Sequence, residues 1–301
     1  MAKQRIVRLK GKFYDMGTPN VSFRVVASTL RKLGIKNWYF MLEIKDYSLI
    51  KTDPHATDSK TGHTSLTKDQ VQRVITECAR NPWYFLREVV RINSPAGAVP
   101  YRANRGNIAQ AWCFLNHIDS WLCLPRQQGK TVSALAIELW AYIFGCVYSL
   151  FMFINKDSKN AKTNLETLAK MIDSLPEYMR FQSITASDGK VIKAKRNATQ
   201  LSHPVNGNSI DIKPKATSYE SALNIARGFS APIIHYDEPE FTPFIDVIVE
   251  NSVSTFKTAS KSAIEKGYCS ARIFTCTPKH LWAWIAVMLL RKTPLIAGNS
   301  C

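Results

Sequence analysis

The sequence predicts an α/β fold with a central, mostly parallel β-sheet flanked by helices. Three stretches of the 301-residue chain carry this prediction. Trp121–Leu124 is a short apolar run before a polar turn and an apolar-rich helical pattern. Tyr148–Ile154 is a continuous apolar run, typical of a buried parallel strand, and a second helical pattern follows it. Ala231–Tyr236 is a third run. Because strands alternate with helices, we expect a parallel sheet.

Composition limits the classes of protein that fit this chain. The net charge of +17 favours a polyanionic partner such as nucleic acid, since binding to phosphates releases counterions. The seven cysteines form no C-x-x-C pair, which indicates reduced thiols in a cytosolic protein and disfavours a zinc site. The N-terminus lacks the apolar core of a signal peptide, and the longest apolar run, Leu281–Leu290, is too short to span a bilayer. We therefore expect a protein that is neither secreted nor bound to a membrane.

Residues 1–66 form an N-terminal region to which we assign no role. Val21–Val26 and Trp38–Ile44 have the β-branched and aromatic content of strands, and the polar stretch Lys51–Ser65 resembles a linker. A domain of residues 67–280 then begins with a helix, because Thr67 and Gln70 have the spacing of a capping box. A second helix is expected to start at Pro82, with Asn81 as its N-cap.

The turn after Trp121–Leu124 has the composition of a phosphate-binding loop. Its residues are Pro125, Arg126, Gln127, Gln128, Gly129, Lys130 and Thr131. Since a helix follows, backbone N–H groups at its start are expected to face phosphate oxygens of ATP. Lys130 would contact the β- and γ-phosphates, and Thr131 would hold Mg²⁺. The loop departs from the usual pattern because Leu124 replaces the first glycine. The alternative is an ordinary helix start with a surface lysine.

Upstream of this loop, Gln110 is our candidate for the adenine contact, with Arg105 next. Motor ATPases often place a polar residue before the phosphate loop for this purpose, but Gln110 also fits an ordinary exposed helix position. Further along, the basic run Lys190–Arg196 fits either a DNA-phosphate contact or a solvated hairpin.

Asp237 and Glu238 follow the third apolar run directly. In phosphate-loop enzymes, an Asp at such a strand end holds Mg²⁺, and a Glu beside it polarises the attacking water. Both would lie at the carboxyl edge of the sheet with Lys130. His235 is interpreted as a structural residue of the strand. Arg227, which precedes a glycine, is a candidate phosphate sensor or arginine finger, and the alternative is a surface arginine.

The stretch Ala271–Thr277 is expected to form a strand that ends in hydroxyl groups. Placed beside the carboxylate strand, Thr275 and Thr277 would sense the γ-phosphate and transmit its loss. The alternative is a strand that ends at a Thr-Pro turn.

Together these motifs resemble the ATPase domain of the large terminase subunit of tailed bacteriophages. Four stretches between residues 67 and 278 carry the resemblance: the Pro125–Thr131 loop with its Arg-Gln pair, the helix at Asn81-Pro82, Arg227-Gly228 before Ile233–Glu238, and Thr275–Pro278. The resemblance implies a P-loop NTPase fold of the additional-strand (ASCE) type. It also implies that Arg126 and Arg227 stabilise transition-state charge, one of them in cis and the other from a neighbouring subunit, and it leaves open which arginine acts in trans.

The family also suggests partners and a location. These are double-stranded DNA, the portal and prohead, the small terminase subunit, and further copies in a ring, in the host cytoplasm. One departure is large, because family members continue into a nuclease domain with clustered carboxylates. Residues 281–301 form an atypical tail, and Lys279–Cys301 contains no Asp or Glu. We therefore expect ATP hydrolysis without DNA cleavage, with a separate polypeptide supplying the nuclease. The alternatives are a helicase-type translocase and an inert DNA- or prohead-binding fragment.

Overall fold

A six-stranded sheet forms the centre of the molecule. The computed structural model describes residues 6–95, 97–213 and 215–277. The strand order is β10-β11-β7-β12-β13-β6, in which all neighbours are parallel except β10 and β11. The strands are β6 (Ser120–Cys123), β7 (Leu150–Asn155), β10 (Gln200–Ser202), β11 (Ser209–Ile212), β12 (Ile233–Asp237) and β13 (Ala271–Cys276). The predicted α/β fold with a mostly parallel sheet is confirmed.

Strand β13 lies between β6 and β12, although it comes last in the chain. Thr275 of β13 pairs with Asp237 of β12, and Cys276 pairs with Cys123 of β6. The carboxyl ends of these parallel strands therefore meet at one edge of the sheet. A strand inserted between the loop strand and the carboxylate strand is the arrangement of the additional-strand P-loop fold, as predicted.

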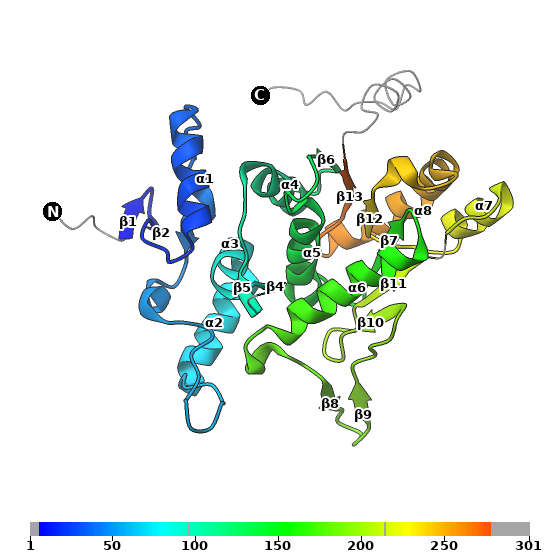
Figure 1. Cartoon of the computed structure of the whole chain (residues 1–301). Coiled ribbons are helices and arrows are strands. Elements are labelled where there is room, and N and C mark those ends of the chain that lie inside the picture. The colour runs from blue at the N-terminus through cyan, green and yellow to red at the C-terminus, as the bar shows by residue number, and fades with distance from the viewer. Residues whose placement is uncertain (1–5, 96, 214, 278–301) are drawn as a thin grey trace.

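Helices cover both faces of the sheet (Figure 1). Phe151 and Phe153 of β7 join the hydrophobic cluster that includes α4, α5 and α6, whereas Met152 and Ile154 join the cluster that includes α7 and α8. Successive side chains of a strand point to opposite faces, so a continuous apolar run supplies both clusters. The helices are α4 (Arg105–Leu115), α5 (Lys130–Trp140), α6 (Ser158–Asp173), α7 (Tyr219–Arg227) and α8 (Ile245–Glu265).

A stack of three aromatic rings joins the strands that carry the site. The rings of Trp121 and Phe274 lie 4.3 Å apart and those of Phe274 and Tyr236 lie 4.6 Å apart, with interplanar angles of 9° and 5°. Each residue belongs to a different strand, namely β6, β13 and β12. Stacked pairs contribute about 0.5–1.5 kcal/mol beyond their buried area. The stack therefore stabilises the strand order at the functional edge.

The helix starts predicted from capping residues are present. Thr67 and Gln70 form the capping box of α2 (Lys68–Arg80). The Asn81 side chain accepts a hydrogen bond from Tyr84 N–H at the start of α3 (Pro82–Tyr84), which continues as a π-helix over Phe85–Val89. A short hairpin of β4 (Arg91–Ser94) and β5 (Gly97–Pro100) then leads to α4.

The prediction of a strand at Val21–Val26 is wrong. These residues begin helix α1 (Val21–Lys32), in which Phe23, Val26 and Ala27 are buried. Their spacing of three and four residues places them on one helical face, and this spacing outweighs the β-branched content. The stretch Trp38–Ile44 is also mostly not a strand. It contains a 3₁₀ turn, Phe40–Leu42, and only the short strand β3 (Glu43–Ile44).

The N-terminal region contacts the rest of the chain closely. Strands β1 (Ile6–Leu9) and β2 (Lys12–Asp15) form a small sheet with β3. Phe23 and Phe85 belong to one hydrophobic cluster. The side-chain amide of Asn20 donates to the carbonyl oxygens of Arg87 and Tyr101, both at 2.9 Å. The boundary at residue 66 stays a prediction.

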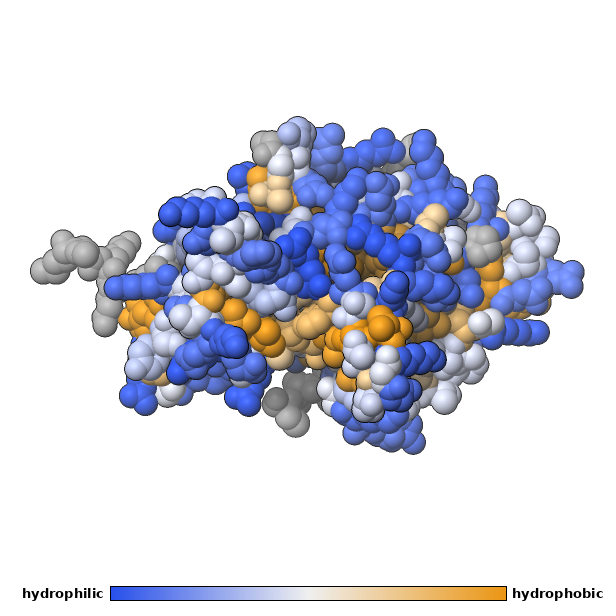
Figure 2. Space-filling view, turned by 90° about the horizontal axis from the view of Figure 1, so that it is seen from below, coloured by the Kyte–Doolittle hydropathy of each residue, from blue (hydrophilic) through white to orange (hydrophobic). Residues whose placement is uncertain are grey.

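A two-stranded hairpin, β8 (Ser183–Thr185) and β9 (Val191–Lys193), projects from the body of the molecule (Figure 1). The face seen from below, on which the hairpin projects, is mostly hydrophilic (Figure 2).

In the described part of the chain no helix is long and apolar enough to cross a membrane. The predicted tail at 281–301 and Pro278 lie outside the described residues.

His203 is a buried histidine between β10 and β11. It is 7% exposed, and its Nδ1 accepts hydrogen bonds from the backbone N–H groups of Val205 and Asn206 at 3.3 and 3.4 Å. Burial lowers the pKa of His203 to about 4. In an unfolded chain a histidine has a pKa of about 6.5. The unfolded state therefore binds a proton at a pH where the folded state does not.

We predict that His203 makes the protein less stable in mild acid. The contribution of neutral His203 to the free energy of unfolding is fully present above pH 6.5 and is lost as the pH falls towards 4. Between pH 7 and pH 5 the loss is about 2 kcal/mol. Denaturant titrations at both pH values measure the loss. In His203→Asn, whose side-chain oxygen can still accept the two hydrogen bonds, the loss should be smaller. The exposed His117→Asn is the control, and an equal loss in both variants would contradict the assignment.

Candidate active site

The loop between β6 and α5 has the strand, loop and helix order that the sequence predicts. Gly129 is its last residue before α5, and a φ of 69° places it in the left-handed region that favours glycine. Gln127 also has a positive φ, at 63°. Helix α5 begins at Lys130, so the first N–H groups of the helix have no partner within it. The loop therefore presents backbone donors together with the positive end of a helix dipole.

Neighbouring residues fix the position of this loop. The Asn104 side chain donates to the carbonyl oxygen of Gln128 at 3.0 Å, while it also caps α4. A Cβ atom at Gly106 would lie 3.2 Å from Leu122 of β6, so the absence of a side chain lets α4 approach the strand. Residues from the segment before β6 thus hold the loop in place.

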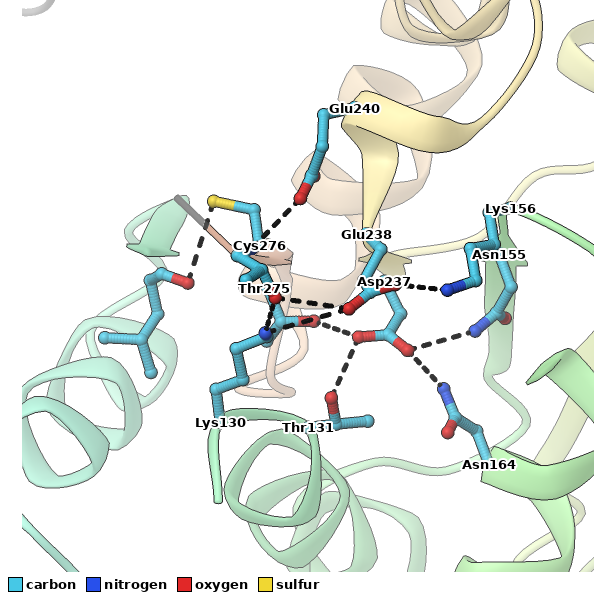
Figure 3. Close-up of polar contacts among 12 residues, drawn as sticks. Lys130, Thr131, Asn155, Lys156, Asn164, Asp237, Glu238, Glu240, Thr275 and Cys276 are labelled. Atoms are coloured by element: carbon cyan, nitrogen blue, oxygen red, sulfur yellow. Dashed lines mark hydrogen bonds and ion pairs between the residues drawn. The ribbon is translucent and has the colours of Figure 1, made fainter. Parts of the chain in front are cut away.

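Asp237, at the end of β12, accepts hydrogen bonds from four side chains (Figure 3). Its Oδ1 accepts from the hydroxyls of Thr275 at 2.6 Å and Thr131 at 2.9 Å. Its Oδ2 accepts from the amides of Asn164 at 2.9 Å and Asn155 at 3.3 Å. The residue is 8% exposed. Because all four partners donate to its two oxygens, the Asp237 carboxylate is held in one orientation.

Thr131 and Asp237 form the link between the two predicted motifs, which lie 106 residues apart. Mg²⁺ binds one or two protein oxygens and completes its shell with waters and phosphate oxygens. A hydroxyl and a carboxylate at 2.9 Å suit such a site. Among the described residues no group of three or more His, Cys, Asp or Glu side chains could hold a metal ion.

Glu238 follows in a left-handed conformation, with φ 51° and ψ 53°. Its backbone N–H donates to the carbonyl oxygen of Thr275 at 2.7 Å. Its Oε2 accepts from Lys156 Nζ at 2.6 Å, and its Oε1 accepts from the Thr277 hydroxyl at 3.2 Å. Lys130 Nζ lies 3.9 Å from Oε1. The carboxylate is thus surrounded by two ammonium groups and a hydroxyl.

The Lys130 side chain points inward. The residue is only 7% exposed, and its Nζ donates to the hydroxyl of Thr277. The alternative of a surface lysine is therefore wrong. A buried ammonium beside a carboxylate and a hydroxyl, at the start of a helix, is a natural contact for a phosphate group.

A chain of buried polar groups lies behind Asp237. His235 Nδ1 lies 3.2 Å from Glu138 of α5, and its Nε2 lies 3.1 Å from the Thr275 hydroxyl. Since that hydroxyl donates to Asp237, Nε2 must carry a proton and act as the donor. Burial raises the pKa of Glu138. Burial alone would lower the pKa of His235, but the charge and hydrogen bond of Glu138, together with the charge of Asp237, raise it. His235 therefore helps to orient the carboxylate, in line with a structural role.

Three other residues predicted for the site, Arg126, Arg227 and Gln110, make no contact with Asp237 or Glu238 among the described residues. Arg126, in the loop, and Arg227, the last residue of α7, are both exposed and have no hydrogen-bond or ion-pair partner there. Gln110 is 3% exposed on α4, so the alternative of an exposed helix residue is wrong. Both polar atoms of its amide lack a hydrogen-bond partner among the described residues.

The structure adds residues that the sequence analysis missed. Asn155 is the last residue of β7, Lys156 follows it, and Asn164 lies on α6. Glu240 Oε1 accepts a hydrogen bond from the backbone N–H of Thr277 at 2.9 Å. The signal for Asn155 and Lys156 was their place directly after the apolar run at 148–154, where a parallel strand reaches the same edge as Asp237. Asn164 had no comparable signal.

Comparison with known proteins gives matches among solved structures only, since no family model and no curated protein matches the chain. The large terminase of a thermophilic bacteriophage has a TM-score of 0.44 at 17% identity, covering 62% of this chain and 42% of that one. The HK97 bacteriophage large terminase has a TM-score of 0.44 at 17% identity, and the match covers 76% of this chain and 43% of the HK97 protein. The ATPase domain of the Thermus phage P74-26 large terminase has a TM-score of 0.38 at 17% identity, and the match covers 64% of this chain and 68% of that domain's chain. The chain spans about two fifths of the first two proteins, and it is similar in structure to phage large terminases.

Proposed function

We propose that this protein is the ATP-hydrolysing motor subunit of a viral DNA-packaging terminase. One observation supports this proposal above all. Lys130 and Thr131, from the loop after β6, meet Asp237 and Glu238, from the end of β12, at one edge of the sheet. This edge combines phosphate-binding donors, a magnesium ligand pair and a carboxylate that can accept a proton.

The reaction is the attack of water on the γ-phosphate of ATP. Thr131 and Asp237 would hold Mg²⁺, which supplies charge neutralisation at the phosphate oxygens. Lys130 exchanges its contact with Thr277 for a phosphate oxygen. Glu238 orients the water and takes its proton as the oxygen–phosphorus bond forms and the bond to ADP breaks. The described residues fit these roles by type and position.

The predicted arginines complete the proposal. Arg126 belongs to the loop itself, so it acts in cis on the phosphates. Arg227 acts on the site of a neighbouring copy in a homo-oligomeric ring, which agrees with its exposure at the end of α7. Charge from such an arginine raises rates by about 10³–10⁵. Thr275 and Thr277 respond to the γ-phosphate through Asp237, Glu238 and Lys130.

Gln110 is proposed as the adenine contact. Its amide is buried on α4, whose N-cap Asn104 holds the loop, and neither polar atom has a partner among the described residues. An amide can both donate to and accept from an adenine edge. Leaving such groups unpaired costs about 1–3 kcal/mol, so a partner here would be favourable.

The other partners follow from the proposed role. They are double-stranded DNA, the portal and prohead, and the small terminase subunit, all in the host cytoplasm. The net charge of +17 supports DNA as the main polyanionic partner.

Steady-state ATP hydrolysis with and without double-stranded DNA tests the proposal. We expect Mg²⁺-dependent turnover that DNA stimulates, and translocation along duplex without unwinding. Strand separation by the purified protein would instead support a helicase-type translocase. No hydrolysis under any condition, in a folded protein that still binds DNA, would support an inert DNA-binding fragment.

We predict that the β8–β9 hairpin contributes to DNA binding by charge. Lys190, Lys193 and Lys195 are exposed, whereas Arg196 is already paired with Asp173 through two contacts of 2.6 Å. Replacing the three lysines by alanine should weaken binding to all duplex sequences alike. The slope of log affinity against log salt should fall by about 0.9 for each phosphate that the protein no longer neutralises.

Fluorescence anisotropy over a salt series measures both effects. The control removes the same charge elsewhere, at the exposed Lys32, Lys36 and Lys68. An unchanged slope in the hairpin variant, or the same change in the control, would show that the hairpin is an ordinary solvated hairpin.

A further inference from the structure

Lys156 contacts the carboxylate that the proposed reaction uses as a base. It directly follows β7, which lies beside β12 in the sheet. Its Nζ lies 2.6 Å from Glu238 Oε2, and Figure 3 shows the two side chains pointing toward one another. This is the shortest polar contact that Glu238 makes through its side chain.

The two oxygens of Glu238 have different partners. Oε1 faces the Thr277 hydroxyl at 3.2 Å and Lys130 Nζ at 3.9 Å. Oε2 faces Lys156 alone among the described residues. In the proposed reaction Lys130 moves to phosphate, so the environment of Oε1 changes while that of Oε2 does not. Oε1 is thereby the oxygen that becomes available to water.

Contacts within the protein hold Lys156 in place. The preceding residue, Asn155, is buried and bonded to Asp237, which fixes the backbone at the end of β7. The ammonium also lies 5.6 Å from the centre of the Phe241 ring. Phe241 belongs to the helical turn directly after Glu238, so cation and carboxylate are tied to the same segment.

We propose that Lys156 is a positioning residue for Glu238: it anchors Oε2 so that Oε1 faces the attacking water. This inference rests on the proposed function, in which Glu238 accepts the proton from water. A carboxylate with one anchored oxygen keeps a defined orientation, whereas a free one rotates among several. Misplacing a reacting group by about 1 Å costs about 10²-fold in rate.

A purely structural ion pair would behave differently. The Lys156 side chain is 32% exposed and that of Glu238 is 19% exposed. Lys130 Nζ lies 3.9 Å from Oε1, so Glu238 keeps a cationic neighbour when Lys156 is removed. Removing the lysine should therefore leave the fold intact, so a large loss of rate in a folded variant would report on the site and not on stability.

The test compares Lys156→Met, Lys156→Arg and the matched control Lys159→Met. Lys159 is an exposed lysine on the first turn of α6. We expect Lys156→Met to lower kcat by about 10²-fold, while KM for ATP and the affinity for MgADP change by less than about threefold. Lys156→Arg, which keeps a cationic donor, should recover most of the rate. Thermal melting confirms that all variants are folded.

Each outcome decides one question. A folded wild-type protein without turnover would overturn the proposed function and this inference with it. Normal or faster turnover by Lys156→Met, beside an active wild-type protein, would overturn only the role of Lys156. An equal loss of nucleotide affinity and kcat, without rescue by arginine, would also overturn it, since this pattern indicates general damage to the site.

The same variants in a Glu238→Ala background provide a second measurement. If Lys156 acts through Glu238, then Lys156→Met should lower the residual rate no further in that background. A further loss of similar size would show that Lys156 acts on something other than Glu238.

Discussion

Replacing Lys130 by alanine is expected to abolish ATP hydrolysis and leave the fold intact. The ammonium contacts Thr277 and lies 3.9 Å from Glu238, at the edge of the sheet where the γ-phosphate would bind. Removing it takes away a charge aimed at the phosphate in both the ground and transition states. Loss of one such donor costs on the order of 10²–10³ in rate, and a charged donor costs more.

The fold should survive because the polar contacts of the Lys130 ammonium are with groups of the site itself, Thr277 and Glu238. Glu238 also keeps its contact with Lys156. Nucleotide binding, steady-state turnover and thermal melting are measured together. Lys162→Ala, at an exposed position of α6, is the control. Near-normal turnover in a folded Lys130→Ala protein would exclude this loop as the phosphate site.

The loop and its helix could be predicted because their signal is local. An apolar run, a glycine and a helical pattern occupy consecutive residues, so no knowledge of distant contacts is needed. The convergence of Lys130 with Asp237 could also be predicted. Parallel strands place their carboxyl ends at one edge whatever their order, and the structure confirms this arrangement of strands.

The partners of those residues could not be predicted in the same way. Asn155 and Lys156 lie beside Asp237 and Glu238 only because β7 is the neighbour of β12. The sequence pattern does not predict which strands are neighbours in the sheet, and polar residues follow nearly every strand. Asn164 is still harder to predict, since it lies on a helix and reaches Asp237 across the edge of the sheet.

The wrong prediction at Val21–Val26 has a different cause. Valine and phenylalanine favour strands through packing on a pleated surface, a preference that depends on context. The apolar residues at 23, 26 and 27 have helical spacing, and this face packs into the core. Periodicity was therefore the more reliable signal in this segment.

Replacing Glu238 by glutamine is expected to separate binding from chemistry. The amide keeps an oxygen and the size of the side chain, so MgATP should still bind. It cannot accept the proton from water, and loss of a general base costs about 10²–10⁴ in rate. We therefore expect unchanged affinity for MgATP together with a large loss of kcat.

Asp237→Asn should have a different effect, because this carboxylate accepts from Thr131, Thr275 and two asparagines. The two hydroxyls can turn and accept from the new amide, so the site can remain hydrogen-bonded. The variant loses the negative charge that favours Mg²⁺. Its affinity for MgATP should fall, and higher Mg²⁺ concentrations should restore part of the binding.

Glu240 provides the control that makes this prediction decisive. Its Oε1 accepts from the backbone of Thr277, and its Oε2 is buried without a hydrogen-bond partner among the described residues. Apart from Asp237, which is proposed to hold Mg²⁺, it is the carboxylate nearest to Glu238 in sequence. Normal turnover by Glu238→Gln together with loss of turnover by Glu240→Gln would move the role of base to Glu240. Loss in Glu238→Gln alone would keep it at Glu238, because only that carboxylate lies between the two lysines.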